Sequence, residues 1–507
     1  MSKESHNKLI IKNTLALSLR MMLTICIGIY ASRVLLSNLG IENYGVYNVV
    51  GGVIGLFSFL NVTLINGTQR YLNFYLGKKD EFALNKVFST SVNVFIALAL
   101  IILVLSETIG LWFVNYKLTI PTDRLFAANV VYQFTIISSL VNIISTPYNA
   151  LIVAYEKMST FAIISIVQSV MMLAFAVVLP WIPLDCLITY SLLVCILHIG
   201  IRLYYGHYCN KTFSNVKHSF TIDKRLFKEM FYFSGWTLTG TFAYMTYNQG
   251  IVFLLNMSFG PIINAAQSLA MQVNNSLNGF SGSFMTASKP RITKYYAEDD
   301  LNNMRSLIFT SSKMSYLIMT LISMPFLICT DQILNIWLTE IPEFTKPLLQ
   351  IILIITIWNT LSIPAVTGIH ATGNIKKFQI VESIILLSIL PISYIALKLY
   401  HNPIIVYSVM LMVMIIVQFV RLKFMNKLLG VDIKSYLIDI VARLTTATAS
   451  SIALGIIVNR LLPENIWGFI ISITIQEIIT LCIFFCIALN NNQRCKLTGY
   501  IRRKIAV

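Results

Sequence analysis

The sequence predicts an all-α integral membrane protein of about fourteen transmembrane helices, built as two six-helix repeats plus two extra C-terminal helices. Hydrophobic residues make up 56% of the 507 residues and charged residues only 12%, and the mean hydropathy is +0.74. The apolar residues form runs of about 20, long enough for a helix to cross a bilayer. Strands of a membrane barrel are about half as long and alternate in polarity, so these runs exclude a barrel.

The predicted spans follow one another with short connections and no room for a soluble domain. They are 13–36, 46–66, 88–113, 126–152, 160–182, 186–206, 229–256, 261–286, 307–330, 346–370, 379–399, 403–420, 437–459 and 466–489. The seventh and eighth are the least sharp, because both are rich in Asn, Gln, Ser and Thr. The first span is too long for a cleaved signal peptide and contains Arg20, so we interpret it as a true span.

The basic residues predict the orientation. With the N-terminus inside, the inner segments and adjoining span ends hold 30 of the 38 Lys and Arg residues, the outer segments and adjoining span ends hold 5, and 3 are counted within spans, namely Arg20, Arg33 and Arg443. Cytoplasmic loops of membrane proteins carry such an excess, so both termini are predicted to be cytoplasmic, in a bacterial inner membrane. The net charge of +17 is therefore a topology signal, and no nucleic acid is predicted as a partner.

Matched residues at a nearly constant spacing indicate the internal repeat. Three pairs share one offset, namely Pro147 with Pro364, Ala154 with Ala371, and Phe161 with Phe378. A slightly larger offset relates Gly40 to Gly260, Arg70 to Arg291, Tyr75 to Tyr296, and Phe88 to Phe309. The predicted organisation is a six-helix lobe at 1–206, a basic cytoplasmic linker at 207–228, a second six-helix lobe at 229–424, and two further helices with a basic tail at 425–507.

Two arginines near or within the first span are candidates for binding an anionic substrate. A charged side chain at membrane depth is costly and so indicates a function. Arg20 lies near the middle of the span, where either snorkelling to the inner interface or a cleft-facing position is open. A guanidinium in a cleft suits phosphate, because it offers bidentate donors. Arg33 lies near the outer end, where snorkelling competes with the same role.

Amide side chains form the second candidate feature. Asn264, Gln267, Asn275 and Asn278 recur at spacings of three, four or seven, which places them along a polar stripe on one helix. Asn61, Asn248 and Gln249 add amides on two other predicted spans. Groups of this kind suit a sugar in a wet cavity; the alternative is hydrogen bonding between helices.

Other candidates are fewer. Glu107 and Glu382 are the candidate carboxylates for ion coupling, against ordinary solvation near an interface. Pro147 and Pro364 fall within spans and are candidate hinges, against static bends. The cysteines and histidines show no ligand spacing, so no metal and no cofactor is predicted. The sequence lacks a P-loop, H-E-x-x-H and G-x-S-x-G, so no enzyme activity is predicted either.

Four stretches resemble a known family. Residues 33–47 read RVLLSNLGIENYGVY, 146–157 read TPYNALIVAYEK, 289–296 read KPRITKYY and 333–338 read ILNIWL. They resemble the Wzx-type O-antigen flippases of the multidrug/oligosaccharidyl-lipid/polysaccharide exporter superfamily. The resemblance implies MATE-like lobes. It also implies that undecaprenyl-pyrophosphate-linked oligosaccharide repeat units, for O-antigen, capsule or another surface polysaccharide, move from the inner to the outer leaflet. Arg20 and Arg33 are the matching candidates for cavity cations.

The predicted function is therefore a flippase that works by alternating access. Its predicted partners are the lipid-linked oligosaccharide substrate and membrane lipids, with a polysaccharide polymerase and a chain-length regulator as further candidates. The alternative on the same fold is a cation-coupled multidrug exporter, although such exporters tend to carry an acidic residue where the first span has arginine. A membrane polymerase or ligase of sugar chains is a third alternative, but the short outer loops argue against it.

Overall fold

The computed structural model is helical throughout its ordered elements. It describes residues 3–56, 61, 64–65, 68–69, 71–72, 75–76, 78, 80–155, 157–213, 216, 218–220, 223–463, 465–488 and 494, with the backbone alone at 3–19, 224–239 and a few single positions. Among these residues there is no strand, and eleven helices are long and apolar enough to cross a membrane. The prediction of an all-α membrane fold is confirmed, while the number of fourteen spans stays a prediction. Arg70 and most of the C-terminal tail lie outside the described residues.

The chain forms two compact units. The first comprises 1–268, 338–343 and 386–403, and the second comprises 269–337, 344–385 and 404–507. The predicted lobe boundaries rest on the sequence repeat and stay a prediction.

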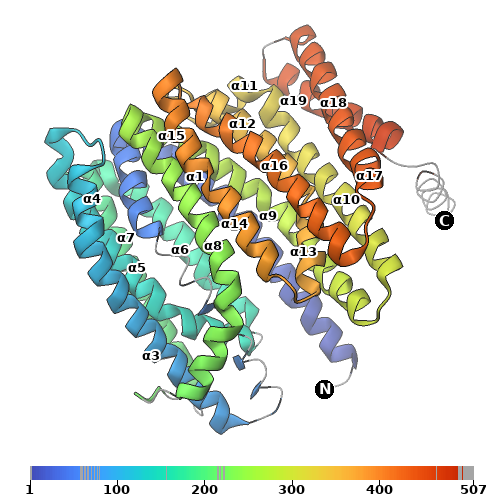
Figure 1. Ribbon diagram of the computed structural model, residues 1–507. Coiled ribbons are helices and arrows are strands. Elements are labelled where there is room, and N and C mark those ends of the chain that lie inside the picture. Colours follow the sequence, from blue (N-terminus) through green and yellow to red (C-terminus); the bar gives the residue numbers. More distant parts are fainter. Residues whose placement is uncertain are drawn as a thin grey trace. The chain divides into compact units, whose positions relative to one another are not determined.

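The first unit is an α-helical bundle (Figure 1). Its elements are α1 (Lys3–Gly55), α3 (Glu81–Leu105), a π-helix (Ser106–Gly110), α4 (Leu111–Tyr116), a 3-10 turn (Thr122–Arg124), α5 (Leu125–Ala154), α6 (Met158–Val178), a second 3-10 turn (Leu179–Trp181), α7 (Cys186–Thr212), α8 (Lys224–Phe259), α15 (Ile389–Tyr400) and the first turns of α9 (Pro261–Ala297). Helix α1 packs along α6, and α5 packs along α7. These pairings fix the helices that carry the candidate arginines.

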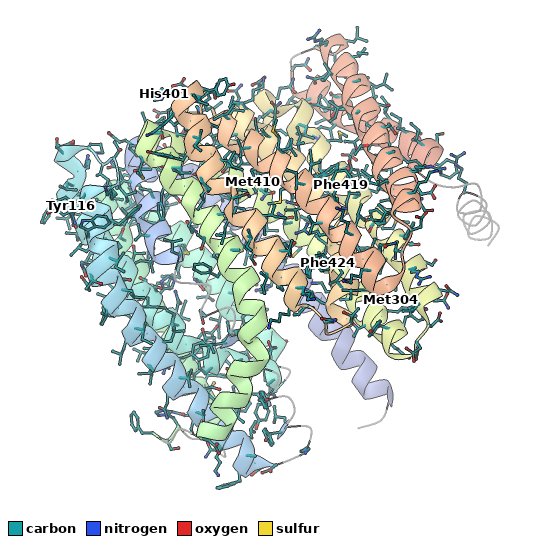
Figure 2. All side chains as sticks on the ribbon, viewed as in Figure 1. Tyr116, Met304, His401, Met410, Phe419 and Phe424 are labelled. Atoms are coloured by element: carbon teal, nitrogen blue, oxygen red, sulfur yellow. The ribbon has the colours of Figure 1, made fainter. Side chains whose placement is uncertain are left out.

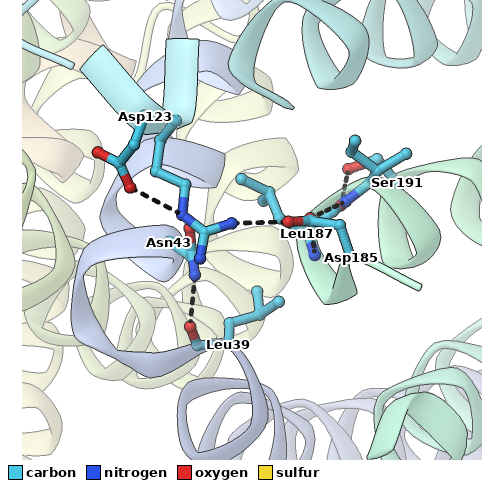
Figure 3. A network of polar contacts seen from close by, with 8 residues as sticks. Leu39, Asn43, Asp123, Asp185, Leu187 and Ser191 are labelled. Atoms are coloured by element: carbon cyan, nitrogen blue, oxygen red, sulfur yellow. Dashed lines mark hydrogen bonds and ion pairs between the residues drawn. The ribbon is translucent and has the colours of Figure 1, made fainter. Parts of the chain in front are cut away.

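A polar network fastens the starts of α5 and α7 (Figure 3). Asp185 caps α7 by accepting hydrogen bonds from the amides of Leu187 and Ile188 at 3.0 and 3.1 Å. The same carboxylate accepts a hydrogen bond from Nη1 of Arg124 at 2.6 Å. The first amides of a helix have no acceptor within the helix, and the Asp185 carboxylate supplies one. Through Arg124 the same carboxylate also links the start of α7 to the start of α5.

The segment between α7 and α8 is bound to buried polar residues of α3. Asn93 donates to the carbonyl of Ser219 at 2.9 Å, and its Oδ1 accepts from Nε2 of His218 at 2.9 Å. The amide of Ser219 donates to Oγ of Ser89, and the amide of Asp223 to Oγ1 of Thr90, both at 3.1 Å. The described part of the predicted basic linker therefore has a fixed place in the first unit.

The second unit is also a helical bundle. Its elements are the rest of α9, α10 (Leu301–Ile328), α11 (Thr330–Trp337), α12 (Thr345–Thr360), α13 (Ile363–Ala371), α14 (Lys376–Leu387), α16 (Ile404–Leu429), α17 (Ile433–Tyr436), a π-helix (Leu437–Ala442), α18 (Arg443–Leu461), α19 (Ile466–Ile483) and a last π-helix (Phe484–Ala488). Helix α10 packs against α12, α13, α18 and α19. The C-terminal helices therefore belong to the core of this unit.

Two local structures recur at the spacing of the predicted repeat. Gly40 interrupts α1 with a φ of 76°, and Gly260, between α8 and α9, has a φ of 77°. Glycine adopts this left-handed region without the steric cost that a Cβ brings. Asp80 and Asp300, separated by the same interval as the two glycines, both cap the following helix through a side-chain oxygen. The structure thus repeats the same corner and the same cap.

Just after the two glycine corners, the backbones of α1 and of the start of α9 come close together within the first unit. A Cβ on Gly45 would lie 2.0 Å from the carbonyl oxygen of Pro261. A Cβ on Gly51, further along α1, would meet nothing within 4 Å. Only the first of these glycines is required by packing.

Candidate functional site

Arg20 lies within the apolar part of α1 and is half-buried. Its Cζ lies 4.9 Å from the ring centroid of Phe161, near the start of α6, which is a cation–π distance. Its Nε is buried without a hydrogen-bond partner, and no carboxylate among the described residues pairs with it. Arg20 is therefore a cation that the first unit orients but does not neutralise.

A second arginine also lies over an aromatic ring without a carboxylate partner. The sequence analysis did not identify it as a site residue. Arg202, on α7, lies with its Cζ 4.0 Å from the ring centroid of Tyr148, on α5. Tyr148 is buried and meets Phe88 edge-on at 5.2 Å between centroids, which fixes the ring under the guanidinium. No carboxylate among the described residues pairs with Arg202.

The neighbourhood of Arg202 shows its uncompensated charge. His218 lies in the segment bound to α3, outside the spans. Burial lowers the pKa of His218, and the positive charge of Arg202 lowers it further. Nε2 of His218 donates its hydrogen bond to Oδ1 of Asn93.

Both arginines cover rings of one aromatic cluster in the first unit. Tyr148 belongs to a buried hydrophobic cluster that also contains Phe88, Tyr205 and Phe213, and the partly buried Phe161 packs against this cluster. Two guanidinium groups over one rigid cluster offer planar, bidentate donors to a phosphate or diphosphate. Each guanidinium group can therefore donate hydrogen bonds to an anion.

The equivalent arginine of the second repeat is neutralised. Arg421, on α16, follows Arg202 at an interval that falls between the two offsets of the repeat. It donates from Nη2 and Nε to Oε1 of Glu382, on α14, at 2.6 and 2.7 Å. Glu382 is one of the predicted ion-coupling candidates. The structure places it in a buried ion pair, and whether it carries an ion stays a prediction.

The register of α6 and α7 indicates which residue of α6 lies at the level of Arg202. Oγ1 of Thr160 lies 3.1 Å from the hydroxyl of Tyr208, and Nε2 of Gln168 lies 3.3 Å from Nε2 of His198. Because the helices run antiparallel, interpolation between these two contacts places Ser165 level with Arg202. The interval from Ser165 to Glu382 equals that from Pro147 to Pro364, so the first repeat has a serine where the second has the carboxylate.

The other carboxylate candidate, Glu107, lies in the π-helix that follows α3. Its Oε2 accepts a hydrogen bond from Nε2 of Gln133 at 3.2 Å. The hydroxyl of Tyr132 donates to the carbonyl of Ser106 at 2.8 Å, one of the groups that the wider turn releases. Such single π-turns are frequent at functional sites, which keeps Glu107 a candidate.

The predicted amides divide into packing residues and accessible residues. Asn264 is fully buried and donates to the carbonyl of Val252 at 2.9 Å, and Gln267 is buried as well. Asn275 is exposed, and Asn278 is half-buried and donates to Oδ1 of Asn274 at 3.3 Å. The stripe on α9 is therefore not uniformly solvated, and its first turns serve helix packing.

The remaining amides lie in the first unit. Asn61 accepts a hydrogen bond from Thr146 at 3.3 Å, next to Pro147. Asn248 donates to the carbonyl of Tyr244 at 2.8 Å. The amide group of Gln249 lies directly over the glycine face of α1, where a Cβ at residue 52 or 55 would be 3.0 Å from it. Arg33, also on α1, is half-buried and has an interaction partner.

The two candidate hinge prolines differ in their surroundings. Helix α5 continues through Pro147, whereas Pro364 follows an interruption between α12 and α13. At that interruption the carbonyl of Leu361 accepts from the hydroxyl of Tyr436 at 2.7 Å and from Oγ of Ser312 at 3.2 Å. The break is thus held by a residue of α17, and motion about either proline stays a prediction.

The second unit contains a buried lysine near the inner end of a predicted span. Lys313, on α10, is 5% exposed and donates from Nζ to the carbonyl of Ala488 at 3.0 Å. Ala488 ends the last π-helix, which has carbonyls that lack the usual helical partner. In the part of the chain that the structure describes, no group of three or more His, Cys, Asp or Glu side chains is placed to hold a metal.

Known proteins share this architecture. Residues 238–395 match the MatE family model, and no curated protein sequence matches the chain. The lipid II flippase MurJ in an inward closed conformation superimposes with a TM-score of 0.69 at 14% identity, over 93% of this chain and 98% of that one.

Two further solved structures share the arrangement. An inward-facing multidrug resistance MATE family transporter of the MOP superfamily gives a TM-score of 0.63 at 12% identity, over 82% of this chain and 99% of that one. A MOP superfamily transporter from Pyrococcus furiosus gives 0.58 at 12% identity, over 83% and 97%. The chain therefore shares its fold with the solved structures of a MATE family transporter and of MurJ.

Proposed function

We propose that the protein is a flippase for polyprenyl-diphosphate-linked oligosaccharide, of the undecaprenyl-pyrophosphate class that supplies O-antigen, capsule or another surface polysaccharide. It moves this substrate from the inner to the outer leaflet of a bacterial inner membrane by alternating access, with both of its own termini cytoplasmic. The observation that carries the proposal is the pair of unneutralised arginines, Arg20 and Arg202, over one aromatic cluster of the first unit.

The chemistry of the substrate explains the need for such a pair. A diphosphate head group cannot cross hydrocarbon without compensation, because an isolated charge at low dielectric is very costly. Two guanidinium groups supply fixed positive charge and bidentate hydrogen bonds, and the protein pairs neither with an internal carboxylate. The polyprenyl tail stays in the lipid, so the site has to accommodate the head group alone.

The extent of the structural similarity supports a flippase. The MurJ match covers 93% of this chain, and the segment after Leu429 is longer than the part left uncovered. The match therefore has to include part of the C-terminal helices. The match to the MATE transporter covers 82% of this chain. The uncovered part is longer than the segment after Leu429, so this match need not include the C-terminal helices. The similarity to the flippase thus extends further along the chain.

The charge of the binding pocket is a reasonable basis for separating functions on this fold. In the Pyrococcus furiosus transporter, the reverse polarity of the binding pocket suggests a different function for that protein. The site of the first unit is cationic, as an anionic head group requires.

A multidrug exporter is the second candidate, and the MatE match over 238–395 favours it. An exporter of organic cations needs an accessible carboxylate to attract its substrate. Glu107 accepts a hydrogen bond from Gln133, and Glu382 is paired with Arg421. Neither candidate carboxylate is free of a protein partner, which weakens this alternative.

Transport by purified protein in vesicles tests the proposal. Vesicles carry a dye-labelled polyprenyl-diphosphate oligosaccharide in both leaflets, and a membrane-impermeant quencher reports the fraction that moves. Arg20→Gln should slow transport about 10- to 100-fold, the loss of a charge-assisted contact of about 1.5–3 kcal/mol. Arg20→Lys should retain part of the rate, because it keeps the charge but not the bidentate geometry.

Arg460→Gln is the matched control, because it removes one exposed cation of α18 and should leave the rate unchanged. Equal rates for the wild type and Arg20→Gln would refute the assignment of Arg20. Failure to move the labelled lipid at all, together with ion-driven uptake of rhodamine 6G, would establish the exporter in its place.

A further inference from the structure

A groove on the second unit lies between α14 and α16 and has a volume of about 360 Å³. Its lining residues are Lys377, Ile380 and Val381 of α14 and Lys423, Phe424 and Lys427 of α16. Three of the six are lysines and none is acidic. The groove shares no residue with the arginine site of the first unit.

The lysines of the groove are not neutralised by the protein. The nearest carboxylate on either helix, Glu382, already accepts two hydrogen bonds from Arg421. Lys377, Lys423 and Lys427 are exposed, and none forms an ion pair with a residue that the structure describes. The groove therefore carries three positive groups that no carboxylate among the described residues pairs with.

The base of the groove is rigid. The Glu382–Arg421 pair joins α14 to α16, and the rings of Phe378 and Phe424 meet edge-on at 5.5 Å between centroids. Phe378 is fully buried. A ligand that enters the groove thus meets a preformed surface, which lowers the entropic cost of binding.

An apolar surface continues from the lysines along both helices. On α16, Phe419, Ile416 and Met412 are 48%, 53% and 66% exposed, and they continue the row of Lys427 and Lys423 at spacings of three or four residues. Figure 2 labels Phe419 and Phe424 on this helix. On α14, Ile384 is 64% exposed and follows Ile380 and Lys377 in the same way. Because residues at this spacing share a helix face, each helix presents cations at one end and hydrocarbon contacts beyond them.

We propose that this groove binds an anionic glycerophospholipid, with its phosphate among the three lysines and its acyl chains along the exposed stripe. A free phosphate would use the lysines but not the apolar surface, and a zwitterionic lipid would leave the charge uncompensated. The start of α14 and the end of α16 are the ends predicted to be cytoplasmic, where basic clusters meet the anionic leaflet. The bound lipid anchors this end of the second unit to that surface.

Binding of dye-labelled phosphatidylglycerol to the full chain in uncharged detergent tests the proposal. The measured quantity is the dissociation constant from fluorescence anisotropy at fixed salt. Near a membrane surface each lysine contributes about fivefold in affinity, so each single Lys→Gln variant should lose about fivefold and the triple variant about 100-fold. The triple Lys→Arg variant should bind like the wild type.

The control variant combines Lys157→Gln, Lys211→Gln and Lys294→Gln, three exposed lysines outside the groove, and should bind like the wild type. An equal loss in this control would show a general charge effect and overturn the proposal, as would unchanged binding by the three single groove variants. Labelled phosphatidylcholine should not bind. Inorganic phosphate should not displace the lipid; displacement at comparable concentrations would replace the lipid with a free anion.

Two further results separate this groove from the proposed transport. Selective binding of a labelled polyprenyl diphosphate, in place of phosphatidylglycerol, would make the groove a substrate site and overturn the assignment. The groove variants should still transport the oligosaccharide lipid in phosphatidylcholine vesicles, where no anionic lipid is present. Each of the two proposals, the lipid site and the transport function, can therefore be refuted without the other.

Discussion

Two arginines at equivalent positions have opposite surroundings, and this difference defines the candidate site. Arg421 forms a buried ion pair with Glu382, whereas Arg202 lies over Tyr148 without a carboxylate. The same helix pair thus gives a closed ion pair in one repeat and an available cation in the other. At the offset that relates Pro147 to Pro364, Ser165 corresponds to Glu382, and we infer that this difference leaves Arg202 without a carboxylate.

Restoring the carboxylate should neutralise Arg202. Ser165→Glu places a carboxylate level with the guanidinium, and an ion pair like that of Glu382 and Arg421 should form. We expect transport of the labelled oligosaccharide lipid to fall about tenfold or more, the value of one charge-assisted contact. Ser165→Gln has the same length without the charge and serves as the control.

A double variant tests whether the effect acts through Arg202. Arg202→Gln alone should lower transport to a similar level, and adding Ser165→Glu should cause no further loss, because interacting residues are not additive. A full additional loss in the double variant would mean that the glutamate acts on something else.

Single residues were predictable where they broke a pattern. Arg20 stands out in the sequence because it interrupts an apolar run, and the structure leaves it unneutralised. Arg202 and Lys313 did not stand out, because each lies near a predicted span end where a basic residue is ordinary. Only the tertiary structure shows that Tyr148 lies beneath one and that the carbonyl of Ala488 meets the other.

At the scale of elements, the repeated glycine corners explain how α1 and the start of α9 come close together. Gly40 and Gly260 adopt the same left-handed backbone, and shortly after the first corner Gly45 touches the backbone of Pro261. Neither atom in this contact belongs to a flexible side chain. The approach is therefore fixed by glycine and cannot be relieved by a change of rotamer.

Gly45→Ala should destabilise the first unit by about 1–3 kcal/mol, the usual cost of forcing an extra methyl group into a packed site. The measurement is the apparent unfolding temperature in detergent. Gly51→Ala is the matched control, because a Cβ there meets nothing within 4 Å. It should be neutral or stabilising by up to about 1 kcal/mol, since alanine favours a helix. A wild-type unfolding temperature for Gly45→Ala would contradict the close approach.

The elements themselves were largely predictable, and their irregularities were not. Apolar runs of helical length gave the all-α membrane fold, and α8 and α9 occupy the two predicted spans that were too polar to define sharply. The π-helices at Ser106–Gly110 and Leu437–Ala442 have no sequence signal, because an extra residue in a turn is stabilised by partners from other helices. The break before Pro364 likewise depends on Tyr436 of α17.

At the scale of the whole molecule, the C-terminal helices complete the second unit. The hydroxyl of Tyr436 satisfies the carbonyl exposed at the break between α12 and α13, and the last π-helix accepts the buried ammonium group of Lys313. Without these helices the same residues would be polar groups in hydrocarbon, which costs several kcal/mol each. The sequence repeat predicts an added pair after two six-helix lobes, and this division stays a prediction; by their contacts the C-terminal helices belong to the second compact unit.

Truncation after Gly430 should therefore leave the chain unstable. Lys313 would lose the carbonyl of Ala488 as an acceptor, and a lost hydrogen bond of a charged group costs about 1.5–3 kcal/mol. We expect little monodisperse protein after extraction in mild detergent.

Lys313→Met in the truncated chain should recover part of the monodisperse protein, because methionine fills a similar volume without a charge. Lys289→Met, which replaces an exposed lysine, should recover none. Equal yields of the truncated and full chains would show that the C-terminal helices are dispensable, and equal recovery by both methionine variants would show that Lys313 is not the cause.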